Sequence, residues 1–192
     1  MFFRVAKNVA QMEISAATTP RAPGNVPYLI DNLWEWLRPS EFPSRRTAAF
    51  ASPSVVLAAA SANGLAADAW GVEFLDGQTA VQITSGRKPE DARYHEDIRC
   101  LTRLIVREWL GTSWLGLPAN NRGPEAVLFL PCATKTDVGE AIAASKFLNA
   151  EMVRENSTFW SDVSTFECAE SPPHPSGEIF FGGAYRLVPL NP

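Results

Sequence analysis

The chain has 192 residues, of which 46% are hydrophobic and 20% are charged. This balance is typical of a globular protein and excludes a disordered or fibrous one. The net charge of −4 argues against nucleic-acid binding, because the chain has no excess of basic side chains to neutralise a phosphate backbone.

The cysteines and the apolar runs predict a cytoplasmic protein. Cys100, Cys132 and Cys168 are far apart, without C-x-x-C spacing, which predicts reduced core thiols and neither a disulfide nor a metal site. No apolar run approaches the roughly 18 residues that a membrane helix needs. The sequence therefore predicts no membrane partner.

The first predicted elements are a strand, a loop and a helix. Residues 2–6 form a short apolar run interrupted by Arg4, which predicts a strand. The arginine faces water at a sheet edge in one interpretation and binds an anion at a cleft in the other. Three prolines and a glycine make residues 15–27 a loop. A helix follows, with Asp31 or Asn32 as its cap and with Trp34 and Trp36 directed mainly to the core.

The next stretch predicts a strand that runs into a capped helix. Residues 47–51 form the strand, and Ser52-Pro53-Ser54 is a helix-start signal for an alanine-rich helix over 54–62. Asn63-Gly64 ends this helix in a left-handed turn. Further on, residues 70–75 and 79–84 alternate around Asp76-Gly77, which predicts a β-hairpin.

The second half of the sequence predicts further helices and strands. Ile98, Leu101, Ile105 and Trp109 have helical spacing, which predicts an amphipathic helix over 89–109 with a solvated charged face. The further predicted elements are a loop over 111–124, a buried strand over 126–130, a helix over 137–154, and strands over 159–166, 178–181 and 182–189.

Several well-known catalytic motifs are missing from the sequence. It contains no G-x-S-x-G elbow, no Walker loop, no G-x-G-x-x-G and no H-E-x-x-H. The two histidines, His95 and His174, lie in a charged helix and in a proline-rich loop, where surface positions are expected. The sequence therefore gives little support to a mechanism that depends on histidine.

Three short motifs remain, Phe3-Arg4-Val5, Ala49-Phe50-Ala51-Ser52-Pro53 and Gly177-Glu178-Ile179-Phe180-Phe181. In this order they resemble the first, second and third motifs of the ADP-ribosyltransferase superfamily, including NAD-degrading, toxin-like branches such as the RES domain. The resemblance covers the order of elements over most of the chain and rests on about a dozen residues. It implies an α+β fold in a single domain over residues 1–192, with a split antiparallel or mixed β-sheet core and flanking helices.

The resemblance implies a site for NAD as substrate, with a protein as one acceptor of ADP-ribose. Glu178 and Arg4 would be catalytic, and Arg4, Phe50 and Ser52 would bind NAD. An arginine can bind the diphosphate, an aromatic ring can stack on nicotinamide, and a carboxylate can stabilise the positive charge that develops as nicotinamide leaves. Arg45 and Arg46 would add positive charge for the diphosphate, and the alternative is that they lie at the surface.

Two departures from the family pattern narrow the expected chemistry. Phe50 stands where tyrosine is commoner, and Ser176 stands two residues before Glu178, where enzymes that modify arginine carry glutamine or glutamate. The sequence therefore predicts transfer to another acceptor, or NAD cleavage by water. The alternative is a non-catalytic inhibitor or interaction module that binds a partner through the tryptophan-rich helix or the 111–124 loop.

Overall fold

A computed structural model describes residues 1–7, 13–15, 17–22, 24–75, 79–167 and 170–190. The chain divides into two compact units, each assembled from separated segments. Unit 1 comprises Met1–Pro20, Ser40–Tyr94 and Asp162–Pro192, and unit 2 comprises Arg21–Pro39 and His95–Ser161. The single domain expected over residues 1–192 stays a prediction.

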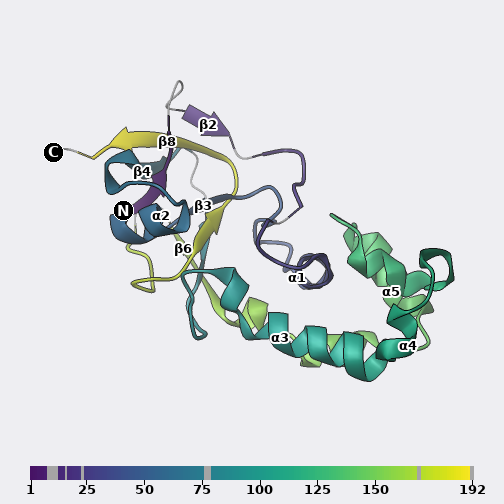
Figure 1. The fold of residues 1–192 in the computed structure, drawn as a ribbon. Helices are drawn as coiled ribbons and strands as arrows, with labels where there is room; N and C mark the ends of the chain where they lie inside the picture. Colours follow the sequence, from purple (N-terminus) through teal and green to yellow (C-terminus); the bar gives the residue numbers. More distant parts are fainter. Residues whose placement is uncertain (8–12, 16, 23, 76–78, 168–169, 191–192) are drawn as a thin grey trace. The chain divides into compact units, whose positions relative to one another are not determined.

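Unit 1 contains two antiparallel four-stranded sheets (Figure 1), so the fold is α+β, as the sequence predicts. The first sheet has the strand order β1 (Phe2–Val5), β4 (Ala69–Phe74), β8 (Ala184–Pro189), β2 (Glu13–Ser15). The second has the order β3 (Ala49–Ala51), β7 (Ile179–Phe181), β5 (Thr79–Ile83), β6 (Val163–Glu167). Every strand pairing in these two sheets is antiparallel.

The core of unit 1 is an aromatic and aliphatic cluster to which both sheets contribute. The ring of Phe2 in the first sheet has its centroid 5.9 Å from that of Phe166 and 5.8 Å from that of Phe181, both in the second sheet. A pair of backbone hydrogen bonds also joins the sheets, because Phe3 and Ser52 each donate to the carbonyl of the other at 2.8 Å. Residues near the start of the chain are thus fixed beside the end of β3.

The predicted hairpin is wrong in its pairing. Both strands form, but β4 pairs with β1 and β8, and β5 pairs with β6 and β7. The Asp76-Gly77 turn on which the prediction rested lies outside the described residues. Local alternation identifies strands, whereas the choice of partner depends on burying Val72 and Phe74 from one sheet against Ala80 from the other.

The short helices of unit 1 are α2 (Val55–Ser61), η1 (Ala66–Asp68) and η2 (Ala92–Tyr94). Helix α2 packs on β1 and β4 (Figure 1) and begins as the sequence predicts, because the Ser54 hydroxyl accepts a hydrogen bond from the Leu57 amide. It ends at the predicted left-handed residue, since Asn63 has φ 48°. The predicted serine cap is confirmed, but Pro53, which the signal places in the first turn, lies before the cap Ser54.

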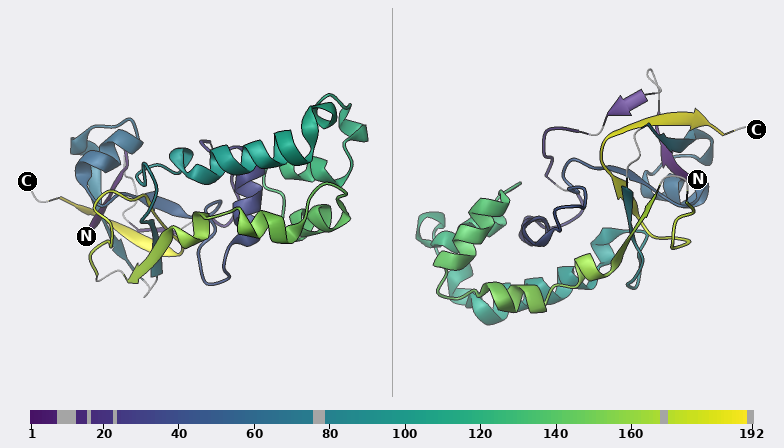
Figure 2. Two further views of the ribbon diagram at one scale, coloured as in Figure 1. Left: turned by 90° about the horizontal axis from the view of Figure 1, so that it is seen from below. Right: turned by 180° about the vertical axis from the view of Figure 1, so that it is seen from behind.

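Unit 2 is helical (Figures 1 and 2). Its elements are α1 (Tyr28–Leu37), α3 (Glu96–Thr102), η3 (Arg103–Trp109), α4 (Gly111–Leu115), η4 (Ala119–Asn121), η5 (Pro124–Phe129), α5 (Lys135–Ala144), α6 (Ala150–Glu155) and η6 (Phe159–Ser161). Among the described residues, no helix is both long enough and apolar enough to cross a membrane.

Several predicted boundaries in unit 2 are wrong, and hydrogen bonds of buried or capping side chains explain why. Asn32 does not cap α1, because its side chain is fully buried and bonds Leu128 O, Leu130 O and Ala133 N. The expected strand over 126–130 is instead part of the helical turn η5. The expected helix over 137–154 is split, because the Ser145 hydroxyl accepts bonds from Phe147 N and Leu148 N and so ends α5.

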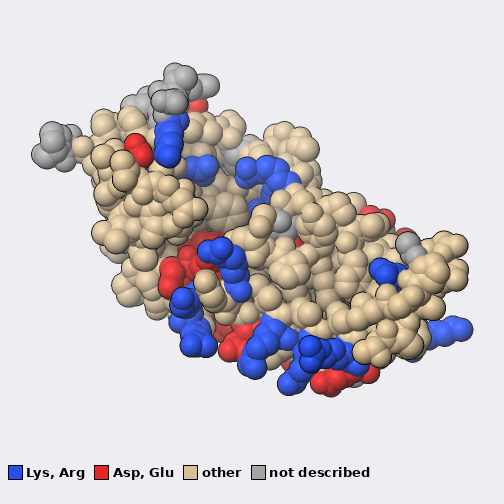
Figure 3. All heavy atoms as spheres, viewed as in Figure 1, with Lys and Arg blue, Asp and Glu red and all other residues tan. Residues whose placement is uncertain are grey.

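The predicted helix over 89–109 begins only at Glu96, and two buried ionisable side chains, His95 and Asp97, lie at its start. His95 is 6% exposed and caps the helix by accepting a hydrogen bond from Asp97 N at 3.2 Å, so its predicted surface position is wrong. The solvated face itself is confirmed. Figure 3 shows Lys and Arg interleaved with Asp and Glu over α3 and the helical turns that follow it, and two such pairs are Arg99–Glu96 and Arg103–Glu108.

Candidate functional site

An ion pair lies at the centre of the candidate site in unit 1. Arg45 Nη1 is 2.7 Å from Glu178 Oε1, and the two side chains are only 9% and 14% exposed. The guanidinium carbon of Arg45 also lies 5.1 Å from the ring centroid of Phe50 and 5.2 Å from that of Phe180. The cation is therefore held by two aromatic rings and a carboxylate, in a setting with little water to screen it.

The two rings are brought together by the pairing of β3 with β7, which sets Phe50 opposite Phe180. Their centroids are 6.3 Å apart. Because side chains alternate along a strand, Ala49 and Ala51 are buried on one face of β3 while Phe50 points to the other and is only partly buried. Of the two phenylalanines, Phe50 is thus the one that keeps some exposure, since Phe180 is fully buried.

Arg4 reaches the same strand from β1. Its Nη1 donates a hydrogen bond of 3.3 Å to the carbonyl oxygen of Phe50, and its guanidinium carbon lies 5.8 Å from the ring centroid of Tyr185. Arg4 lies on β1, an edge strand of the first sheet, as the first interpretation expects, but it is partly buried. The structure brings Arg4, Phe50, Arg45 and Glu178 into one chain of contacts.

Ser52 and Arg46 are buried beside this cluster, each 6% exposed. Ser52 is held by its backbone bonds to Phe3, and a role of its hydroxyl toward NAD stays a prediction. Arg46 donates its backbone amide to Ser44 Oγ at 3.3 Å. Since Arg45 and Arg46 are both withdrawn from solvent, the surface role weighed for them is wrong.

The backbone of Glu178 is held from two sides. Its amide donates to Pro89 O at 2.7 Å, and its carbonyl accepts from Ile83 N at 3.0 Å. The second carboxylate oxygen, Oε2, lies 3.5 Å from Ala92 N. These bonds fix the backbone of Glu178 directly before β7, which begins at Ile179, close to the predicted start of this strand at residue 178.

Two neighbours of Glu178 were missed at the level of sequence. Gly177 has no space for a side chain, because a Cβ there would lie 1.8 Å from Ile83 O. Gln82 is fully buried in β5 and bonds the loop before Glu178. The available signals were a glycine directly before the glutamate and one amide within the apolar run Ala80-Val81-Gln82-Ile83.

No protein family model, curated protein or solved structure matches the chain. The chemistry of the site therefore has to follow from its own side chains. It offers two guanidinium groups, one partly exposed phenylalanine and one carboxylate, a set suited to a ligand with anionic and planar aromatic parts.

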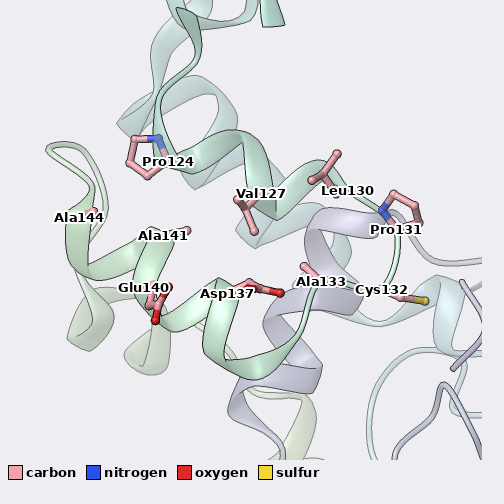
Figure 4. A pocket seen from close by; sticks show the side chains of 10 residues that line it. All are labelled: Pro124, Val127, Leu130, Pro131, Cys132, Ala133, Asp137, Glu140, Ala141 and Ala144. Atoms are coloured by element: carbon pink, nitrogen blue, oxygen red, sulfur yellow. The ribbon is translucent and has the colours of Figure 1, made fainter. Parts of the chain in front are cut away.

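Unit 2 contains a hollow of about 590 Å³ (Figure 4), but none of the six predicted site residues lines it. It is lined by Pro124, Val127, Leu130, Pro131, Cys132, Ala133, Asp137, Glu140, Ala141 and Ala144. Of its two acidic residues, Asp137 already belongs to the cap of α5 and accepts bonds from the amide and the hydroxyl of Thr134. These bonds hold the pKa of Asp137 below its usual value. This carboxylate has a structural task.

Proposed function

We propose that the protein consumes NAD, with an ADP-ribosyltransferase-like fold in which Glu178 and Arg4 are catalytic and Arg4, Arg45 and Phe50 bind the dinucleotide. The observation that supports this most is the Arg45–Glu178 ion pair against the Phe50 ring. It joins two of the three sequence motifs, and the bond from Arg4 to Phe50 O joins the third.

The side chains present match the parts of NAD. The diphosphate is a bidentate acceptor for guanidinium groups, and two of them contact Phe50: Arg4 bonds its carbonyl oxygen and Arg45 lies over its ring. The ring of the partly exposed Phe50 offers a face on which nicotinamide can stack. These contacts would place the ribose next to the carboxylate.

The reaction needs no metal and no histidine. The bond between ribose C1′ and the nicotinamide nitrogen breaks, and its electron pair leaves with nicotinamide. Glu178 stabilises the positive charge on the ribose and accepts a hydrogen bond from its hydroxyl. A nucleophile then forms the new bond to C1′ and releases a proton, and water as nucleophile gives hydrolysis.

The resting ion pair gives Arg45 two tasks. Without substrate it holds the Glu178 carboxylate at 2.7 Å and offsets its charge. A guanidinium has five N–H donors. Arg45 can therefore donate some of them to a diphosphate and keep one hydrogen bond to the Glu178 carboxylate. Ser176, two residues before Glu178, disfavours arginine as acceptor, which leaves water or another nucleophile.

The non-catalytic alternative stays a prediction. It uses the tryptophan-rich helix or the 111–124 segment to bind a partner, and of their tryptophans Trp34 is 1% and Trp114 is 4% exposed, whereas Trp36 is only partly buried. Trp34 donates its ring N–H to Asp97, and Trp114 donates its own to Arg122 O. Both rings belong to the core of unit 2, as predicted for Trp34.

Nicotinamide release from NAD by the purified protein, alone and with cell lysate, tests the proposal. Wild-type protein should release nicotinamide, and Glu178→Gln should lower the rate about 10²–10³-fold, the usual effect of removing one group that stabilises the transition state. Glu73→Gln is the matched control, because it removes an exposed carboxylate of the same unit that pairs with Arg186. Absence of release in both conditions, or equal rates for wild type and Glu178→Gln, would refute the function.

A further inference from the structure

Gln82 is an amide buried where the surrounding sequence is apolar. It lies near the end of β5, 0% exposed, between Val81 and Ile83, which are also buried. A buried amide is costly unless its donors and acceptor find partners. Gln82 therefore has to be explained by what it bonds.

Within the described part of the chain, the hydrogen bonds of the Gln82 side chain all go to the backbone of residues 174–177. Its Nε2 donates to His174 O at 2.8 Å and to Gly177 O at 2.9 Å, and its Oε1 accepts from His174 N at 2.8 Å. One amide thus uses two donors and one acceptor on the chain just before Glu178. These three bonds clamp the segment at both of its ends.

The segment needs such a clamp because of its composition. Pro172, Pro173 and Pro175 lack the N–H group that a strand would donate to a neighbour. Within the segment, His174 Nδ1 accepts a bond from Ser176 N at 3.2 Å, which closes a local turn. The Gln82 amide supplies the longer-range bonds that a regular strand would have made through its backbone.

The residues that Gln82 holds lead directly to Glu178. In the register of the second sheet Gln82 is opposite Ile179, the residue after Glu178. The side chain of Gln82 holds Gly177 O, and the next amide along β5, Ile83 N, holds Glu178 O. Gly177 packs so closely that an added Cβ would lie 2.9 Å from Gln82 Cγ.

We infer that Gln82 is a positioning residue, which holds the 174–177 segment so that the Glu178 carboxylate stays against Arg45. The catalytic part of this inference rests on the proposed NAD chemistry. Catalytic geometry is sensitive, since a displacement of about 1 Å can cost about 10²-fold in rate. Because the side-chain bonds of Gln82 go to the backbone of His174 and Gly177, its effect on the site passes through Glu178.

Amide hydrogen exchange tests the clamp without reference to activity. Gln82→Met keeps the length of the side chain and removes all three bonds, whereas Gln82→Glu keeps the acceptor for His174 N. Exchange at His174 and Glu178 should become at least about tenfold faster in Gln82→Met, with a smaller change in Gln82→Glu. Thr84→Val is the matched control, because it removes a side-chain bond from the same region of the chain to Asp162 O. Exchange at both amides unchanged from wild type in Gln82→Met would overturn the inference.

A double-mutant cycle on nicotinamide release tests the catalytic part. Gln82→Met should lower kcat about 10²-fold with KM for NAD within about twofold, and it should cause no further loss in a Glu178→Gln background. An equal loss in both backgrounds would mean that Gln82 only affects the amount of folded protein, which overturns its positioning role. If wild-type protein releases no nicotinamide, the proposed function fails, and hydrogen exchange alone decides whether Gln82 holds Glu178.

Discussion

Each unit contains a carboxylate withdrawn from solvent, and the two differ in how completely they are bonded. Asp97 in unit 2 is 2% exposed and accepts hydrogen bonds from Trp34 Nε1, Ser157 Oγ, Thr158 N, Thr158 Oγ1 and Phe159 N. Glu178 in unit 1 has, among the residues that the structure describes, one short ion pair of its carboxylate, to Arg45, and one long contact, to Ala92 N.

This difference separates a structural carboxylate from a candidate reactive one. A carboxylate offers about four acceptor positions. Those of Asp97 are filled, mostly by groups of residues 157–159, which connect α6 to η6. Among the described residues Glu178 accepts fewer bonds, and its partner is a guanidinium with several N–H donors. A ligand can therefore compete for Glu178, whereas it would have to unfold part of unit 2 to reach Asp97.

The largest expected effect on stability comes from Asp97→Ala. It leaves the Trp34, Thr158 and Phe159 N–H groups buried without their acceptor, so it should lower the free energy of unfolding by about 3–5 kcal/mol. Glu178→Gln should lower it less, by about 1.5–3 kcal/mol, because glutamine keeps one acceptor oxygen for Arg45 and Arg45 keeps its contacts with two rings. Urea unfolding of both variants measures the contrast, and equal losses would contradict it.

Gly177→Ala should have an intermediate effect, because the new methyl group meets Ile83 O and the strand has to shift. Overpacking of this kind costs about 1–3 kcal/mol, and it should also lower nicotinamide release by moving Glu178. Gly24→Ala is the matched control, because a Cβ there would contact nothing within 4 Å. Thermal unfolding and the release assay report the two effects, and wild-type activity in Gly177→Ala would show that the position of Glu178 is not critical.

The smallest effect concerns pH and the Asp137 cap in unit 2. Hydrogen bonds from the side chain and the backbone of Thr134 lower the pKa of Asp137 below its ordinary 3.8. Ionised Asp137 therefore stabilises the folded protein above that pH, and this contribution is lost as the pH falls through the lowered pKa. Asp137→Asn should reduce the loss in thermal midpoint between pH 5 and pH 3.

Glu140→Gln, which changes an exposed carboxylate of the same helix, is the control for the Asp137 measurement. The cap hypothesis would be contradicted by an Asp137→Asn protein whose midpoint falls with pH as steeply as that of wild type. Because Asp137 is exposed, the measurement belongs at low salt, where screening is weakest.

Local signals in the sequence identified those parts of the fold that local physics decides. The Ser54 cap, the left-handed Asn63 and the strands around Arg4 and Phe50 follow from residue types at adjacent positions. Glu178 was predictable as the residue that leads into a strand. Its ion pair with Arg45 was not predicted, because the two are separated by 133 positions in sequence.

The failures come from long-range partners. The apolar run over 126–130 fits a strand or a buried helical turn equally well, and the side chain of Asn32, which bonds Leu128 O and Leu130 O, selects the turn. His95 and Asp97 look like members of a charged surface run, yet the tryptophan and serine groups that bond Asp97 come from distant segments. The role of Gln82 could not be predicted, because its hydrogen-bond partners are backbone atoms, which every residue type has.

The strand order of unit 1 has a consequence for the time at which the site is completed during synthesis. β7 lies between β3 and β5, and β8 lies between β4 and β2, so the last two strands made occupy inner positions in both sheets. A nascent chain that extends only to β6 contains Arg4, Arg45 and Phe50 but neither Glu178 nor the strands that join its neighbours. The ribosome must therefore deliver residues 178–189 before the Glu178 carboxylate meets Arg45, and the proposed nucleotide chemistry would have to wait until the sheets close.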